Sequence, residues 1–267
     1  MSALADHLLI APIVLPLAAA ALMLLFEEHR HALKAAISVS ASLLVLAVAL
    51  ALFFRVEAPV MHVYPIGNWP APLGIVLVAD PLAALMVVLA ATLGLAALVF
   101  SLARWHRLGP HFHSLVQFML AGLNGAFLTG DLFNLFVFFE LLLAASYGLA
   151  LYGAGVPRVR ASLHYIVVNL AASLLFLIGV SLLYGVAGTL NMADIALRVA
   201  ALPDSDRVLA EIGIGVLAIA FFAKAGMWPL GFWLAPAYAA ASAPAAALFA
   251  ILTKVGIYAV LRLWLLV

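Results

Sequence analysis

The stretch DLFNLFVFFELLLAASYGLALY, from Asp131 to Tyr152, decides the fold class of this chain. It is long enough to cross a bilayer as a helix, which takes about 20 apolar residues. Its only charged residue after the opening aspartate is Glu140. At about 1.5 Å per residue, Glu140 lies roughly 13 Å from Asp131, near the middle of a hydrocarbon core about 30 Å thick. A charge at that depth costs about 2.5 to 3.5 kcal/mol, which favours a role in moving protons or cations over a glutamic acid that only bridges helices.

The composition of the whole chain supports this interpretation. Of its 267 residues, 69% are hydrophobic and 9% are charged, and the mean hydropathy is +1.28. A soluble domain has about 25% charged residues, so the chain is predicted to be an all-α polytopic membrane protein. The basic residues are scattered singly, which argues against nucleic-acid binding, and no cofactor is expected. The absence of cysteine excludes disulfides and cysteine-ligated iron–sulfur clusters within the chain.

Apolar runs separated by charged or Gly/Pro-rich breaks predict about eight transmembrane helices. Asp80 followed by Pro81 is a strong helix start, because aspartate caps a helix and proline suits its first turn. The segment 55–79 is too rich in Pro, Gly and Trp to be a span, and 188–207 is a mixed-charge loop with a short surface helix near 192–202. The expected spans are 7–26, 35–54, 80–103, 114–129, 131–152, 163–186, one that begins near 208, and 244–266.

The distribution of basic residues predicts which helix ends face the cytoplasm. The connections after the first, third and fifth spans carry more Lys and Arg than those after the second and sixth. The positive-inside rule therefore places the former in the cytoplasm and the N-terminus outside. No Lys or Arg precedes residue 30, so the first span is interpreted as a retained helix rather than a signal peptide. The two sets are Arg30, Lys34, Arg104, Arg107, Arg158 and Arg160, against Arg55, Arg198 and Arg207.

Three histidines, His106, His111 and His113, gather in one of the predicted cytoplasmic connections. Histidines at this spacing can bind a metal ion, but the connection offers no carboxylate or thiolate to complete a ligand set. We therefore interpret them as an interfacial cluster rather than a metal site.

Lys224 is a second deep charge. It follows the apolar run 212–223 and precedes the equally apolar MWPLGFWL. A Gly/Pro-interrupted segment beside a buried charge indicates a broken helix at a transport site. We therefore predict that the seventh span is discontinuous, and that Lys224 does not simply snorkel to the headgroups. The residues expected to break the helix are Gly226, Pro229, Gly231 and Pro236.

Lys254 is the third deep charge, about 15 Å along its helix from Pro244. Ala247 and Ala250 precede it on the same helix face, and Tyr258 follows it by one turn. Small residues favour close helix packing, so Lys254 is expected to point into the bundle rather than towards lipid.

Three deep charges on three helices indicate proton movement more strongly than any one alone. A lysine in a low-dielectric surrounding releases its proton more readily and a nearby carboxylate holds it, so moving Glu140 relative to Lys224 would make a proton valve. Candidate relay groups are His164, Thr253 and Tyr258, although His164 lies near the cytoplasmic end of its helix. Other polar side chains that suit either ordered water or ordinary interhelical hydrogen bonds are Asn124, Asn134, Ser146, Asn169 and Ser173.

Three segments carry a resemblance to a known family: GDLFNLFVFFELLLAASYGL (130–149), FFAKAGMWPLGFWLAPAY (221–238) and APAAALFAILTKVGIYAVLR (243–262). They resemble the antiporter-like subunits shared by Mrp-type multisubunit cation/proton antiporters and respiratory complex I, and most closely the D subunits of the Mrp, or Pha, type. The resemblance runs from about Leu8 onward, and the motifs follow the family's order and spacing.

The resemblance implies a mechanism in which Glu140 and Lys224 form a charge pair and protonation alternates between Lys224 and Lys254. It implies three N-terminal helices in residues 1–110 and a first five-helix repeat in residues 111–267. The family's polar turn after the helix-seven tryptophan is replaced here by LAPA at 234–237. The family's second repeat is absent from this chain. The chain is therefore either a fragment, which its apolar last residues favour, or half of a split subunit.

The favoured function is a secondary transporter subunit, not an enzyme, in a bacterial inner-membrane antiporter that exchanges Na⁺ or K⁺ for protons alongside other membrane subunits. A proton-translocating subunit of NADH:quinone oxidoreductase (complex I) or of a membrane-bound hydrogenase is the first alternative, which quinone- and iron–sulfur-bearing neighbours would distinguish. A non-transporting scaffold subunit is the second, and it predicts that Glu140→Ala and Lys224→Ala leave function intact. A small-solute channel is disfavoured because solute pores rarely need midplane charges of both signs.

Overall fold

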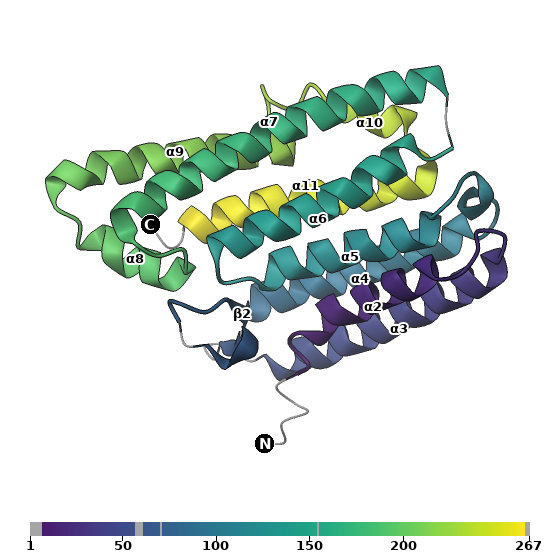
Figure 1. Ribbon diagram of the computed structural model, residues 1–267, viewed down its shortest axis with the longest axis horizontal. Coiled ribbons are helices and arrows are strands. Elements are labelled where there is room, and N and C mark those ends of the chain that lie inside the picture. Colours follow the sequence, from purple (N-terminus) through teal and green to yellow (C-terminus); the bar gives the residue numbers. More distant parts are fainter. Residues whose placement is uncertain (1–6, 57–60, 70, 154, 265–267) are drawn as a thin grey trace.

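The computed structural model describes residues 7–56, 61–69, 71–153 and 155–264, and these are mainly helical (Figure 1). Among them, six helices are long and apolar enough to cross a membrane, and two shorter apolar helices accompany them. Each predicted span corresponds to one of these helices, which confirms the class of all-α polytopic membrane protein. They are α2 (Ala11–Leu24), α3 (His31–Arg55), α4 (Pro81–Ser101), α5 (Phe112–Leu128), α6 (Leu132–Leu151), α7 (Val156–Ala187), α9 (Asp204–Ala225) and α11 (Ala243–Trp264).

Successive helices of these eight run in opposite directions, so their connections gather at two ends of the bundle (Figure 1). The hairpin end holds an antiparallel pair of strands, β1 (His62–Pro65) and β2 (Val76–Ala79), and the short helix α8 (Met192–Ala200). Helix α8 confirms the predicted surface helix, whereas the hairpin lies in a segment that was predicted only not to span. The opposite end, called the loop end here, is formed by residues 25–30, 102–111, 152–153 and 234–242.

Asp80 joins two distant helices at the hairpin end. Its Oδ1 accepts the Ala83 amide at 2.8 Å, which confirms the predicted helix cap. Both of its oxygens also accept hydrogen bonds from the guanidinium of Arg262 in the last turn of α11. Burial alone would raise the pKa of the Asp80 carboxyl, but the hydrogen bonds from Arg262 and Ala83 hold it below its ordinary value. The pair therefore stays charged and fixes α11 to α4.

Asn124 replaces a backbone hydrogen bond that proline removes from α2. Pro16 has no N–H, so the carbonyl of Pro12 one turn earlier loses its partner within the helix. The side-chain amide of Asn124, on α5, donates to that carbonyl at 2.8 Å. Asn124 is therefore an interhelical hydrogen-bond donor, the more ordinary of the two roles that its sequence position allowed.

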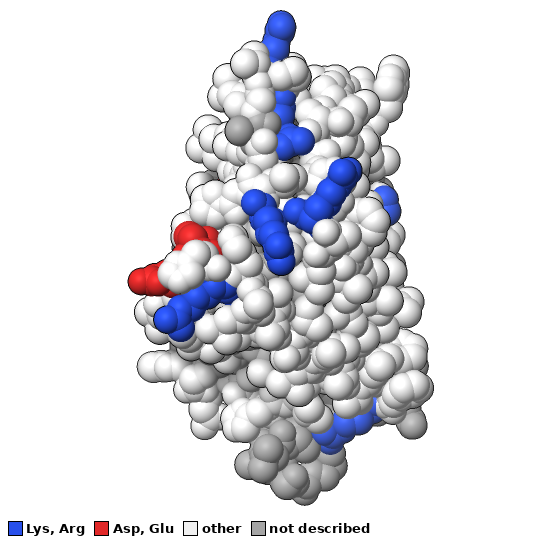
Figure 2. Space-filling view, turned by 90° about the vertical axis from the view of Figure 1, so that its right-hand side faces the viewer, with Lys and Arg blue, Asp and Glu red and all other residues white. Residues whose placement is uncertain are grey.

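The loop end carries basic side chains, as the distribution along the sequence predicted. Figure 2 faces this end and shows several Lys and Arg side chains among mostly uncharged residues. The predicted loop up to residue 162 is wrong, because α7 begins at Val156 and contains Arg158 and Arg160. Pro157 in its first turn favours this early start. The helix has 32 residues, about 48 Å, so it extends well beyond a hydrocarbon core of about 30 Å.

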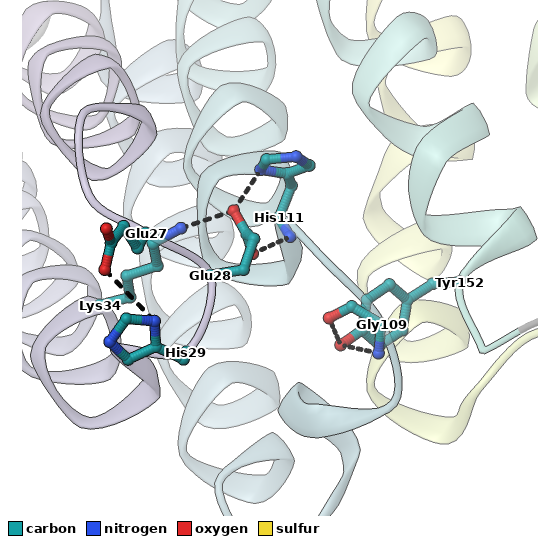
Figure 3. A network of polar contacts seen from close by, with 7 residues as sticks. All are labelled: Glu27, Glu28, His29, Lys34, Gly109, His111 and Tyr152. Carbon is teal, nitrogen blue, oxygen red and sulfur yellow. Dashed lines mark hydrogen bonds and ion pairs between the residues drawn. The ribbon is translucent and has the colours of Figure 1, made fainter.

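A polar network fastens the connections of the loop end to one another (Figure 3). Glu28 accepts the Lys34 ammonium at 2.7 Å, and it also accepts the backbone N–H of His111 at 3.0 Å. Burial alone would raise the pKa of the Glu28 carboxyl, but these partners hold it below its ordinary value. The hydroxyl of Tyr152 bonds both the amide and the carbonyl of Gly109, at 2.9 and 2.8 Å. The connections after α2, α4 and α6 are therefore held in one arrangement.

The clustered histidines do not share one environment. His111 is exposed and contacts Glu28, with its ring Nδ1 2.8 Å from a carboxylate oxygen. His106 and His113 are buried and paired, with 3.1 Å between His106 Nδ1 and His113 Nε2. Burial, with the nearby charge of Arg107, lowers the pKa of the His106 imidazole. The buried pair is therefore kept mainly neutral near pH 7.

Candidate functional site

Glu140 lies midway along α6, where α6 approaches α7. Helix α6 begins at Asp131, whose carboxylate accepts the Asn134 amide at 2.8 Å and caps the helix. Burial raises the pKa of that carboxyl above its ordinary value, although the amide hydrogen bond works against this. The Glu140 side chain is 33% exposed, so part of the carboxylate reaches the surface of the described chain. The cap thus sets the depth at which Glu140 sits.

Lys224 meets Glu140 through a third residue. Lys224 is in the last turn of α9 with its side chain fully buried, and α7 packs against both α6 and α9. The Lys224 ammonium donates to the hydroxyl of Ser173, on α7, at 2.8 Å. That hydroxyl in turn donates to Oε1 of Glu140. The distance from Lys224 Nζ to Glu140 Oε1 is 3.8 Å, so the two charged groups form an ion pair with a hydroxyl between them.

Three of the four predicted break residues follow Lys224 directly. Gly226 closes α9 in the left-handed conformation, with φ +67°. Gly231 lies so close to it that an added Cβ would come within 2.1 Å of the Gly226 carbonyl oxygen, so the turn needs glycine at 231. Pro229 lies between these glycines, whereas Pro236 is in the first turn of the next short helix, α10 (Leu234–Ala240). The chain thus interrupts its helix beside the buried lysine.

Trp233 supports the end of α9 from the far side of this turn. Its indole N–H donates to the Ala223 carbonyl at 3.0 Å, and its side chain is 1% exposed. The last carbonyls of a helix lack partners within the helix, so this bond compensates for the break. The turn next to Lys224 is therefore fixed by a buried hydrogen bond.

The structure does not place Lys254 where the sequence analysis expected it. Within the described residues, Lys254 does not point into the bundle as predicted, because its side chain is exposed on α11. Ala250, one turn before it, is exposed as well, and Ile257 and Leu261 continue the same face at 40% and 46% exposure. The small residues do mark a face suited to close packing, but no helix of the described chain covers it. Lys254 is therefore not brought together with the Glu140–Lys224 pair.

The three candidate relay residues lie in different surroundings. His164 is exposed, with its ring against that of Phe232. The Tyr258 hydroxyl donates to the Phe127 carbonyl at 2.7 Å and accepts from Arg262 at 2.7 Å, which commits it to the hairpin end. The Thr253 hydroxyl is beside Lys254 in the chain and donates to a backbone carbonyl of its own helix.

Sequence reasoning overlooked a set of buried tyrosines near the pair. Tyr147 lies two turns beyond Glu140 on α6, and its buried hydroxyl has no hydrogen-bond partner within the described residues. Next to it, Ser146 shares a 2.6 Å hydrogen bond with the hydroxyl of Tyr165 on α7. Tyrosines in apolar spans are usually assigned to the membrane interface, so only the two-turn spacing of Tyr147 from Glu140 could have drawn attention to them.

The fold and the link from the Glu140 carboxylate through the Ser173 hydroxyl to the buried Lys224 ammonium together define a polytopic membrane protein with charges held inside its helical bundle. Residues 129–267 match the family described as NADH:quinone oxidoreductase/Mrp antiporter, TM. The chain belongs to this family, which confirms the resemblance carried by the three motifs.

Curated relatives and a solved structure agree with this assignment. The chain is 60% identical to the D subunit of a probable K⁺/H⁺ antiporter of Rhizobium meliloti, over 98% of this chain and 50% of the relative. It is 44% identical to the D subunit of a Na⁺/H⁺ antiporter of Alkalihalophilus pseudofirmus, over 98% and 53%. A chain of the Mrp complex from Dietzia superimposes with a TM-score of 0.89 at 34% identity, over 98% and 49%. The chain thus spans about half the length of these proteins.

Proposed function

We propose that this chain is part of a membrane subunit of a multisubunit antiporter that exchanges Na⁺ or K⁺ for protons across the bacterial inner membrane. The observation that carries the proposal is the buried link from Glu140 through Ser173 to Lys224. The likeness to subunits that are named as cation/proton antiporters supports it. The relatives differ in the cation that they are named for, so the proposal includes both ions.

The proposed mechanism follows from the electrostatics of a buried lysine. While the Glu140 carboxylate stays close, it stabilises the ammonium form of Lys224. When the carboxylate moves away or is neutralised, the cost of an unpaired buried charge drives Lys224 to release its proton. A cation that alters the charge around Glu140, which is partly exposed, therefore biases the protonation of Lys224.

Lys254 has the next position in this proposed proton series. A lysine at this depth is not stable against lipid, so we assign the cover of its exposed face to the remainder of the subunit. The chain spans about half the length of its curated relatives, and we propose that the other half of the subunit supplies this cover. Thr253 is the candidate relay adjacent to Lys254, and the other membrane subunits complete the complex.

The proposal is tested in everted vesicles from cells that lack other antiporters. The vesicles hold the complete complex with its full-length subunit, either wild-type or with Glu140→Gln, which removes the charge with little change in shape. Addition of Na⁺ or K⁺ should dequench a pH-sensitive dye in the wild type and not in the variant, at equal amounts of assembled complex. The result that contradicts the proposal is a wild type without any cation response whose proton uptake instead needs an electron donor, because that marks a redox-driven pump.

A further inference from the structure

We propose that the hydroxyl of Ser173 is a proton relay between Lys224 and Glu140, an assignment that rests on the proposed antiport function. The hydroxyl lies beside the line between the two charged groups and bonds both of them. The direct distance of 3.8 Å from Lys224 Nζ to Glu140 Oε1 is longer than a hydrogen bond, which spans about 2.7 to 3.2 Å. A proton that moves directly between the two groups in this arrangement passes through Ser173.

The chemistry of a hydroxyl allows this transfer in one concerted step. A serine hydroxyl has one hydrogen to donate and lone pairs with which to accept. One N–H bond of the Lys224 ammonium breaks as its proton forms a bond to Oγ of Ser173. The original Oγ–H bond breaks at the same time, and that proton forms a bond to Oε1 of Glu140. The products are a neutral amine, a neutral carboxylic acid and an intact serine, so atoms and charge balance.

The surroundings of Lys224 favour the serine over water as the carrier. Its side chain is 0% exposed, and Ser173 is 5% exposed. The ring of Phe139 lies 5.1 Å from the ammonium nitrogen and occupies another side of it. Within the described residues, Ser173 is the one group at hydrogen-bond distance from that nitrogen. Ser173 therefore provides a fixed side chain through which the charged and the neutral forms of the pair interconvert.

The relay has a consequence for the pair's charge state. In the charged form, Ser173 must donate to Glu140 and accept from Lys224, which is the orientation in the structure. After transfer, the hydroxyl is turned around and donates to the amine.

Alanine at position 173 removes both bonds but leaves both charges, whereas threonine keeps a hydroxyl at the same place on α7. The two substitutions therefore separate a relay from a space-filling role.

The test measures cation-driven proton movement by the complete complex with Ser173→Ala, Ser173→Thr or the control Ser181→Ala. Ser181 is an exposed serine on the same helix whose hydroxyl bonds only its own helix. Because proton relays contribute about 10² to 10⁴ in rate, Ser173→Ala should lower the maximal rate at least tenfold with the half-saturating cation concentration unchanged. Ser173→Thr should stay within about threefold of wild type, and Ser181→Ala should match it. The solvent isotope effect of D₂O should rise in the alanine variant, since proton transfer then limits the rate.

Two results would overturn the relay. One is a Ser173→Ala complex that transports at the wild-type rate with the wild-type isotope effect. The other is equal loss in the alanine and threonine variants with less assembled complex, which marks a packing role. Either result leaves the antiport proposal standing if Glu140→Gln still abolishes the cation response. If Glu140→Gln transports normally, the antiport proposal itself fails.

Discussion

The two buried lysines of this chain, Lys34 and Lys224, differ in how they meet their carboxylates. Lys34 contacts Glu28 directly at 2.7 Å, at the loop end of the bundle (Figure 3). Lys224 stands 3.8 Å from Glu140, with the hydroxyl of Ser173 between them. The Lys34–Glu28 pair joins two connections at the loop end, whereas the proposed proton transfer between Lys224 and Glu140 uses the hydroxyl that bridges them. A lysine and a glutamate thus form a structural ion pair in one region and a candidate proton-transfer pair in the other.

The largest expected effect comes from exchanging each lysine for methionine, which keeps the length of the side chain and removes its charge. Lys224→Met should lower cation-driven proton movement more than about 100-fold, because the valve loses the group that carries the proton. Lys34→Met should leave the rate per assembled complex within about twofold. Dye dequenching in everted vesicles, normalised to complex content, measures both. An equal loss of cation-driven proton movement in the two variants would contradict the different roles assigned to Lys34 and Lys224.

An intermediate effect is expected on stability when Glu28 is neutralised. Glu28→Gln weakens the contact with buried Lys34 and with His111, and the Glu28 side chain is 41% exposed. Solvent screening reduces the cost of breaking such a pair to about 1 to 2 kcal/mol. The apparent unfolding temperature of the purified complex should therefore fall by a few degrees, with transport retained. An unchanged unfolding temperature would mean that Glu28 does not fasten the loop end.

The smallest expected effect is a dependence of stability on pH at the same end. The pKa of His106 is lowered from an ordinary value of 6.5 by burial and by Arg107. The folded state therefore binds fewer protons than the unfolded state below about pH 6.5, and its stability falls as the pH decreases through that range. The pKa of Glu28 is lowered from 4.5, so its contribution is lost only below that value.

The measurement compares the apparent unfolding temperature at pH 7.5 and 5.5. The wild-type complex should be less stable at pH 5.5, and His106→Gln should reduce the difference. A wild type with the same unfolding temperature at both values would contradict the assignment of a neutral histidine pair.

The sequence was sufficient to predict features that depend on depth and on single residue types. Glu140 and Lys224 are recognisable as functional candidates because a charge inside an apolar run is costly wherever the helix points. Gly226 and Gly231 indicated the interrupted helix because few other residues can adopt a positive φ or allow so close an approach. These predictions require no knowledge of how the helices pack.

Features that depend on packing could not be predicted in the same way. The surroundings of Lys254 could not be predicted, because Ala247 and Ala250 mark a packing face without identifying its partner. Ser173 was one of several polar residues with equal claims, and only the position of α7 against both α6 and α9 distinguishes it. The strand Val76–Ala79 was not predicted, because its pairing with His62–Pro65 is a contact across an irregular connection.

The ion pair between Asp80 and Arg262 can form only late in the synthesis of the chain. The two residues are separated by 182 positions. At about 5 to 20 residues per second, Asp80 is synthesised on the order of 10 to 40 s before its partner. During that interval the insertion machinery must deliver five further apolar helices, α5, α6, α7, α9 and α11, while the start of α4 has only its own backbone to bind. The hairpin end is therefore complete only after α11 has been inserted. A chain whose synthesis stops before Arg262 lacks the ion pair that joins α11 to the start of α4.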